Sequence, residues 1–196
     1  MSGSAAVRAP LEGRTLSRVG RKPIPIPPGV EVEPFWNGVT VKGPRGTLTQ
    51  TYHPEVRVRV EDSQVVVERL SERKFHHSLH GLTRSLIANA IVGVTDGYSR
   101  TLELMGVGYR VQQTGLGVTL SVGYSHPVEI QPIEGVVLQV EGNNRVHVRG
   151  LDKQKVGAQA ALIRKVRPPN AYKEKGIRYA GEVLRFKPGK AAARKA

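Results

Sequence analysis

Apolar residues alternate with polar ones through the first part of the chain. Val39 and Val41 show this pattern, and it returns in residues 56–60 and 65–67. A period of two is typical of β-strands with one buried face, so these runs predict strands. Glu61-Asp62-Ser63 lies between the last two runs and predicts the turn of a hairpin.

A helix is expected to follow. Ser71 is a residue type that caps helices, and Glu72 would lie in the first turn, where an acidic side chain is favoured. Six apolar residues then recur every three or four positions and predict one buried stripe, made of Phe75, Leu79, Leu82, Leu86, Ala90 and Val94. Gly93 and Gly97 mark the end of this helix.

The same order of patterns returns after Gly97. Alternating residues occupy five further runs, at 101–105, 109–113, 118–122, 136–140 and 146–148. Asp152 is then expected to cap a second helix, whose inward side chains would be Val156, Ala160, Ile163 and Val166. Pro168-Pro169 should end it, because proline disfavours helix in the preceding residue and cannot continue one.

The repetition is also visible in the letters. GVTV from Gly38 corresponds to GVTL from Gly117, His53-Pro to His126-Pro, and VEDSQVVVERL to VEGNNRVHVRGL. A period of about 80 residues is too long for a solenoid. We therefore predict an α+β fold of two similar domains from an internal duplication, each an antiparallel sheet packed by one helix, with basic N- and C-terminal tails.

Charge separates the ends of the chain from its middle. Residues 31–149 carry twelve basic and twelve acidic side chains, whereas residues 150–196 carry thirteen basic and three acidic ones, and residues 1–30 carry five and one. Such localised positive charge favours a nucleic acid, because Lys and Arg displace counterions from phosphates. A membrane partner is not expected, since no amphipathic Trp- or Leu-rich helix and no run of about 18 apolar residues accompanies the charge.

Catalytic and metal sites are not indicated. The chain has no Cys, and His76 and His80 lack the carboxylate of an HExxH pattern, so we interpret them as polar positions on the first helix. The glycines of Gly106-Val-Gly-Tyr-Arg lie between predicted strands and indicate turns, not a phosphate-binding loop. We predict no enzyme, no cofactor, no metal and no small-molecule substrate. A hydrolase whose site is assembled by the fold, and a free-standing nucleic-acid-binding regulator, stay open as alternatives.

The basic stretch RKVRPPNAYKEKGIRYAGE, residues 164–182, is the strongest candidate site. In an extended segment Lys173 and Lys175 would point to one side and contact phosphates, while Glu174 would face away. Tyr172 and Tyr179 could stack on bases, although Tyr179 suits a core position equally well. The full predicted RNA-binding set is Lys153, Lys155, Arg164, Lys165, Arg167, Pro169, Asn170, Tyr172, Lys173, Lys175, Gly176, Arg178, Tyr179 and Lys187.

Three motifs in order resemble the bacterial type of the large-subunit ribosomal protein six family. They are SRVGRKPIPIPPGVEV at 17–32, HGLTRSLIANAIVGVTDGYSRTLELMGVGYR at 80–110 and PPNAYKEKGIRYAGE at 168–182. The resemblance implies two related α+β domains and a structural role in the large ribosomal subunit. It also implies binding to large-subunit ribosomal RNA by the C-terminal domain, near the stalk base and the factor-binding centre, beside neighbouring ribosomal proteins. The expected location is the cytoplasm, in the ribosome.

The resemblance also identifies two departures. Glu174 lies where the family usually has a small residue such as Gly, and the sixteen residues before Ser17 resemble an added extension. Five of the thirteen prolines lie in residues 1–29, which suggests a mobile arm. We therefore divide the chain into an N-terminal arm (1–29), a first α+β domain that serves as scaffold (30–97), a second α+β domain that binds RNA (98–186) and a basic C-terminal tail (187–196).

Overall fold

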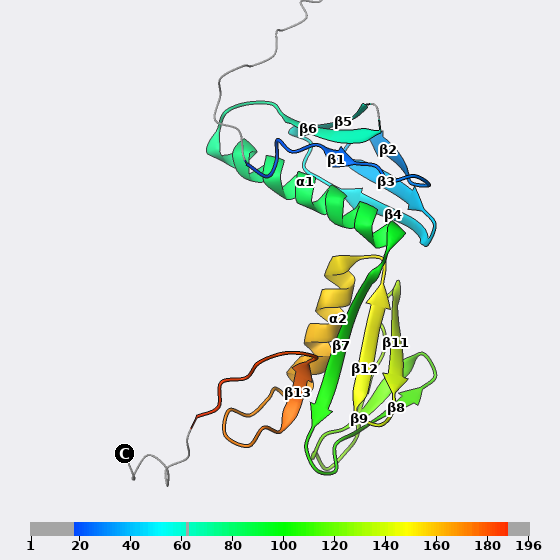
Figure 1. Ribbon diagram of the computed structural model, residues 1–196, viewed down its shortest axis with the longest axis vertical. Helices are drawn as coiled ribbons and strands as arrows, with labels where there is room; N and C mark the ends of the chain where they lie inside the picture. Colours follow the sequence, from blue (N-terminus) through cyan, green and yellow to red (C-terminus); the bar gives the residue numbers. More distant parts are fainter. Residues whose placement is uncertain (1–17, 62, 188–196) are drawn as a thin grey trace, which may run out of the picture.

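A computed structural model describes residues 18–61 and 63–187 of the chain. The predicted extension before Ser17 and all of the basic tail beyond Lys187 lie outside these residues, as does Asp62 of the predicted hairpin turn. The described chain forms two α+β domains, one above the other in Figure 1, and this confirms the predicted fold class.

The first domain contains six strands and one helix: β1 (Ile24–Pro25), β2 (Glu31–Phe35), β3 (Gly38–Gly43), β4 (Gly46–Thr51), β5 (Val56–Glu61), β6 (Gln64–Arg69) and α1 (Lys74–Thr95). Its strands form two antiparallel sheets, in the orders β1-β6-β5 and β2-β3-β4. Ile24 is buried and pairs with Val65. This part of the predicted mobile arm therefore supplies a short strand to the first domain.

The second domain contains seven strands and one helix: β7 (Tyr98–Met105), β8 (Arg110–Thr114), β9 (Gly117–Ser121), β10 (Val128–Ile130), β11 (Val136–Glu141), β12 (Arg145–Gly150), α2 (Lys153–Val166) and β13 (Gly176–Tyr179). Its antiparallel sheets have the orders β11-β12-β7-β13 and β10-β9-β8. Apart from β13, this arrangement repeats the first domain strand for strand. The strand β13 and the loop before it are thus the addition that distinguishes the second copy.

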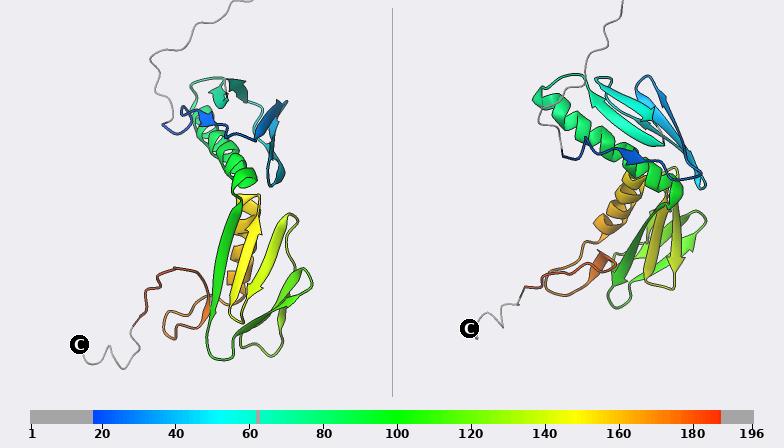
Figure 2. Two further views of the ribbon diagram at one scale, coloured as in Figure 1. Left: turned by 45° about the vertical axis from the view of Figure 1, so that its right-hand side comes forward. Right: turned by 45° about the horizontal axis from the view of Figure 1, so that its top comes forward.

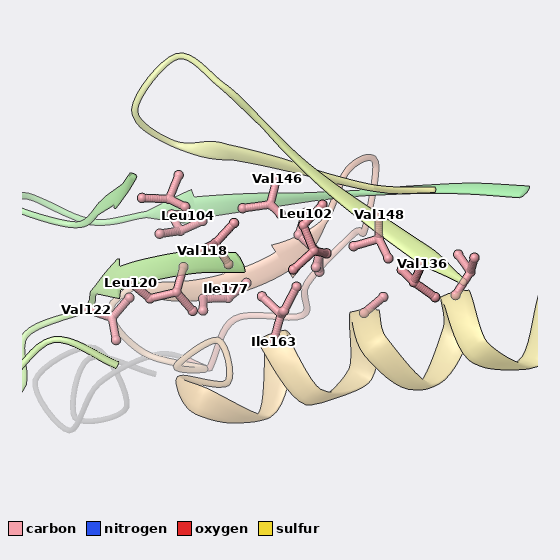
Figure 3. Packing of buried hydrophobic residues seen from close by; sticks show 14 residues of the cluster. Leu102, Leu104, Val118, Leu120, Val122, Val136, Val146, Val148, Ile163 and Ile177 are labelled. Atoms are coloured by element: carbon pink, nitrogen blue, oxygen red, sulfur yellow. The ribbon is translucent and has the colours of Figure 1, made fainter. Parts of the chain in front are cut away.

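Each domain has its own hydrophobic core. In the second domain α2 packs against β7, β12 and β13, and side chains from both sheets meet it (Figure 3). The predicted inward positions of α2 are confirmed, since Val156, Ala160 and Ile163 are buried and Val166 is partly buried. The carboxylate of Asp152 accepts a hydrogen bond from the backbone N–H of Gln154 at 2.7 Å, which confirms the predicted cap.

The predicted register of α1 is partly wrong. The helix begins at Lys74 with Arg73 at the cap position, and the hydroxyl of Ser71 instead contacts the ring of His76. Its buried face holds Leu79, Ala90 and Val94 as predicted, but Phe75 and Leu82 are exposed. The remaining buried positions are His76, His80, Thr83, Ile87, Ile91 and Gly93.

Polar residues explain this error. His76 Nε2 lies 2.7 Å from Glu55 Oε2, and His80 Nε2 lies 2.9 Å from the carbonyl oxygen of Val67. Buried polar groups are tolerated when they find such partners. The two histidines, interpreted from the sequence as polar positions on the helix, therefore lie on its buried face. In the described part of the chain they form no cluster that could hold a metal ion.

The two domains meet where α1 leads into β7 and α2 begins (Figures 1 and 2). A Cβ atom at Gly93 would lie 2.1 Å from the carbonyl oxygen of Leu151, so the backbones touch at this point. The ammonium group of Lys153 donates a hydrogen bond to Asn89 Oδ1 at 3.2 Å, and the hydroxyl of Tyr98 donates to the Asn89 carbonyl at 3.1 Å. These contacts join the first and second domains directly.

Candidate nucleic-acid interface

The basic loop, residues 167–175, connects α2 to β13 and is closed by the protein's own backbone. The N–H of Ile177 donates to the carbonyl of Arg167, and the N–H of Asn170 donates to the carbonyl of Lys175, both at 2.8 Å. The Asn170 side chain accepts hydrogen bonds from the N–H groups of Tyr172 and Lys173, at 2.8 and 3.2 Å. This arrangement is typical of an Asx turn, so Asn170 holds the loop in shape.

The loop is a compact turn, and the predicted extended segment is wrong. Residues 171–173 form the turn, and Glu174 has a φ of 57°, in the left-handed region that side chains with a Cβ adopt at a cost. Lys173 and Lys175 therefore do not alternate along a strand. Both are exposed, and both line the same groove.

Gly176 fixes the loop against the end of α2. Its φ is 142°, and a Cβ atom there would lie 2.5 Å from Pro169 Cα and 2.7 Å from the carbonyl oxygen of Pro168. Real Cβ atoms do not approach other atoms so closely. Glycine is therefore required at position 176, both for the positive φ and for the close approach to the Pro168-Pro169 backbone.

An open groove of about 720 Å³ runs beside the basic loop. Arg167, Lys173 and Lys175 line it from the loop, and Tyr109 and Tyr124 line it from the turns after β7 and β9. No acidic residue lines it among the described residues. A groove that combines basic groups with aromatic rings can hold phosphates and stack bases, as single-stranded RNA requires.

The two tyrosines were missed by the sequence analysis. The hydroxyl of Tyr124 donates to the Val166 carbonyl at 2.8 Å, and the Arg167 guanidinium lies 5.1 Å from the centre of its ring. This cation–π contact positions Arg167 at the groove. The glycines of Gly106-Val-Gly-Tyr109 were assigned to turns without a role for the tyrosine, and Tyr124 was not considered. The turns themselves are confirmed, with φ of 146° at Gly106 and 80° at Gly108.

Two arginines of the predicted RNA-binding set form ion pairs within the second domain. Arg164 forms an ion pair with Glu182 at 2.6 Å, and Arg178 forms one with Glu103 at 3.3 Å. The Arg164 guanidinium also lies 5.5 Å from the centre of the Tyr179 ring, which packs against the second core. Both arginines are partly buried, so their present contacts orient α2, β7 and β13 around the loop.

Glu182 is held in its charged form by this network. Burial raises the pKa of its carboxyl, but the hydrogen bond from the Tyr179 N–H and the contact with Arg164 lower it by more, and the pKa lies below its ordinary value. The Tyr179 N–H donates to Glu182 at 3.0 Å. The chain after β13 is thereby tied back to α2.

The other predicted residues are spread around the domain. Lys165 and Tyr172 are exposed near the loop, and Tyr172 retains 62% of its accessible surface. The backbone N–H of Lys187 donates to the Ala171 carbonyl at 2.9 Å, which lays the end of the described chain along the loop. Lys153 and Lys155 lie in the first turn of α2, at the opposite end of the helix, and are not part of the groove.

Comparison with known proteins agrees with this architecture. The profile of the family described as Ribosomal protein L6 matches residues 25–97 and again residues 105–180, one match in each domain. The chain belongs to the ribosomal protein L6 family. Members of the L6 family are structural ribosomal components and not enzymes, which removes the hydrolase alternative.

Several bacterial L6 proteins are similar over nearly their whole length. The "Large ribosomal subunit protein uL6" of Caldicellulosiruptor bescii is 56% identical over 176 residues, which cover 90% of this chain and 97% of that protein. The uL6 protein of Thermus thermophilus is 55% identical over 180 residues, covering 92% and 100%, and that of Rubrobacter xylanophilus is 54% identical over 176 residues, covering 90% and 99%. The predicted family and its bacterial type are confirmed. No helix among the described residues is long and apolar enough to cross a membrane.

Proposed function

We propose that this chain is a structural component of the large ribosomal subunit in the cytoplasm and that it binds large-subunit ribosomal RNA through the second domain. The observation that carries the proposal is the groove beside the basic loop, which brings Arg167, Lys173 and Lys175 to one surface with two tyrosine rings. The L6 relatives carry the ribosomal part of the proposal, because all three are named large ribosomal subunit proteins.

The shape of the groove favours recognition of RNA backbone and unstacked bases. Lys side chains act as point charges toward phosphates, while tyrosine faces accept bases of any kind. Contacts of this type place a protein on a folded RNA without reading a long sequence. A position near the stalk base and the factor-binding centre, beside other ribosomal proteins, belongs to the proposal through the family resemblance alone.

Salt dependence tests the role of the two loop lysines. Lys173→Ala and Lys175→Ala should each weaken binding to large-subunit ribosomal RNA and lower the slope of log affinity against log salt by about one unit or less. Lys42→Ala is the matched control, because it removes the same charge from a pair with Glu33 in the first domain. If both loop variants keep the wild-type slope, the lysines contact no phosphate.

A free-standing regulator of nucleic acids is the remaining alternative. It predicts protein that sediments apart from ribosomes, whereas the proposal predicts co-sedimentation with the large subunit on a sucrose gradient after a moderate-salt wash. The net charge of +14 alone would give weak, salt-sensitive association with any RNA. Protein that stays bound to the large subunit through the wash is therefore a specific component, whereas protein held by charge alone is removed.

A further inference from the structure

The first domain exposes an unusual group of apolar side chains around the turn between β2 and β3. Trp36, in this two-residue turn, retains 87% of its accessible surface, and Phe35 and Leu70 retain 44% and 51%. Nothing in the described chain covers the Trp36 indole. Exposed aromatic groups gathered in one place usually mark a surface that binds a partner.

A hollow of about 380 Å³ lies beside this turn. Trp36 and Tyr52 contribute rings to it, and Pro34 and Pro54 contribute rigid apolar walls. Arg57 and Arg59 are its only charged lining residues in the described chain. They are two positions apart on β5, so their side chains leave the same face of the strand.

The positive charge of this hollow is only partly neutralised. Arg59 is 3.4 Å from Glu68, whereas no ion pair is found for Arg57 in the described part of the chain. Glu68 also lies opposite Arg57 in the β5–β6 ladder, but its carboxylate pairs with Arg59, and two further carboxylates of the first domain are engaged elsewhere. Glu55 contacts His76, and Glu33 pairs with Lys42. A phosphate would therefore meet an available guanidinium at Arg57.

We propose that this hollow is a second RNA-binding site, in which Trp36 stacks on an unpaired base and Arg57 binds the adjacent phosphate. The inference rests on the proposed function and extends it to the domain that the sequence indicated to be scaffold alone. The volume suits one or two bases, since pockets for small ligands begin at about 300 Å³. An indole beside a guanidinium is the combination by which proteins hold splayed bases on a phosphate backbone. A protein partner would need a wider apolar area and acidic groups opposite the arginines.

Trp36 is the only tryptophan in the chain, so its fluorescence reports on this site without any substitution. The full chain is titrated with isolated large-subunit ribosomal RNA, and complex formation is followed independently by a mobility shift. We expect RNA to quench the Trp36 emission and to reduce its accessibility to acrylamide. Because Trp36→Ala has no tryptophan emission, its affinity is measured by the mobility shift, and it should fall about tenfold, within the range for loss of one stacked base. Trp36→Phe, which keeps an aromatic face, should recover part of that loss.

The outcomes separate the inference from the proposed function. If RNA shifts the protein while the Trp36 emission and accessibility are unchanged, the second site is refuted and the groove in the second domain stands. If Trp36 is shielded only in assembled subunits and not by RNA alone, its occupant is a protein and the inference is again refuted. If the chain neither binds this RNA nor enters subunits, the proposed function fails and the second site fails with it.

Discussion

Replacing Gly176 by alanine would place a methyl group inside the contact between β13 and the end of α2. The new Cβ atom would lie 2.5 Å from Pro169 Cα, 2.8 Å from Pro169 N and 2.7 Å from the carbonyl oxygen of Pro168. All three are backbone atoms, so no side chain can rotate away. A φ of 142° is also unfavourable for alanine. Conformational strain of about 1–3 kcal/mol and overpacking of about 1–3 kcal/mol together give an expected loss of about 2–6 kcal/mol in unfolding free energy of the second domain.

Substitutions at two other glycines separate the two contributions to this loss, conformational strain and overpacking. Gly181 has a φ of 77°, and no atom lies within 4 Å of the position that an added methyl group would take, so Gly181→Ala should cost only the strain, about 1–2 kcal/mol. Gly157 lies exposed in α2 with nothing within 4 Å, and Gly157→Ala should stabilise the domain by about 0.5–1 kcal/mol. Urea denaturation measures the three free energies.

Amide hydrogen exchange shows where the damage occurs. In Gly176→Ala the protons of the Ile177 and Asn170 amides, which close the basic loop, should exchange faster, while those within β12 should change little. RNA affinity should fall as well, because the displaced basic loop would no longer line the groove. The reasoning is refuted if Gly176→Ala costs no more than Gly181→Ala.

Further predictions concern single carboxylates around the same loop. Glu174→Gly should raise stability by about 1 kcal/mol, since Glu174 has a φ of 57°, and should also strengthen RNA binding. Glu174→Gln removes the charge but keeps the strained backbone, so it should strengthen RNA binding without raising stability. Equal stability of the two variants in urea would contradict the strain argument. Because the pKa of Glu182 is lowered in the folded state, its contribution to stability is complete above about pH 4.5 and is lost as the pH falls through the folded pKa. Glu182→Gln should therefore lower the unfolding free energy at pH 7 and make it fall less steeply as the pH is lowered. Chemical denaturation between pH 2 and 7 measures this dependence, and an unchanged curve would contradict the Arg164–Glu182 pairing.

The repeated architecture could be predicted from the sequence because both copies keep the same local patterns. The cap at Asp152 and the stripe of α2 consist of residue types with an unambiguous preference. The buried stripe of α1 was predicted wrongly because hydrophobicity alone assigns Phe75 and Leu82 to the core in preference to the polar His76 and Thr83. Only the contacts of His76 with Glu55 and of His80 with Val67, many residues away in the chain, make that buried face acceptable.

The groove lies beside the loop that the charge pattern indicated, but the residues that line it from other segments were not predicted. Charge density alone identified the loop, but charge does not tell which arginines are already paired. The partner of Arg178 is Glu103, 75 positions earlier in the chain, and no local pattern indicates it. The tyrosines of the groove come from turns that lie far before the loop in the sequence. Their approach depends on the order of strands in two sheets, which sequence periodicity does not determine.

Ultraviolet crosslinking in intact cells, with both the RNA position and the crosslinked peptide identified, tests the central claim most directly. The account predicts crosslinks from the groove, at Tyr109, Tyr124 or the loop residues 167–175, to one region of large-subunit ribosomal RNA. Crosslinks from these peptides scattered over many messenger RNAs, or none from them while other surfaces of the chain crosslink, would contradict it.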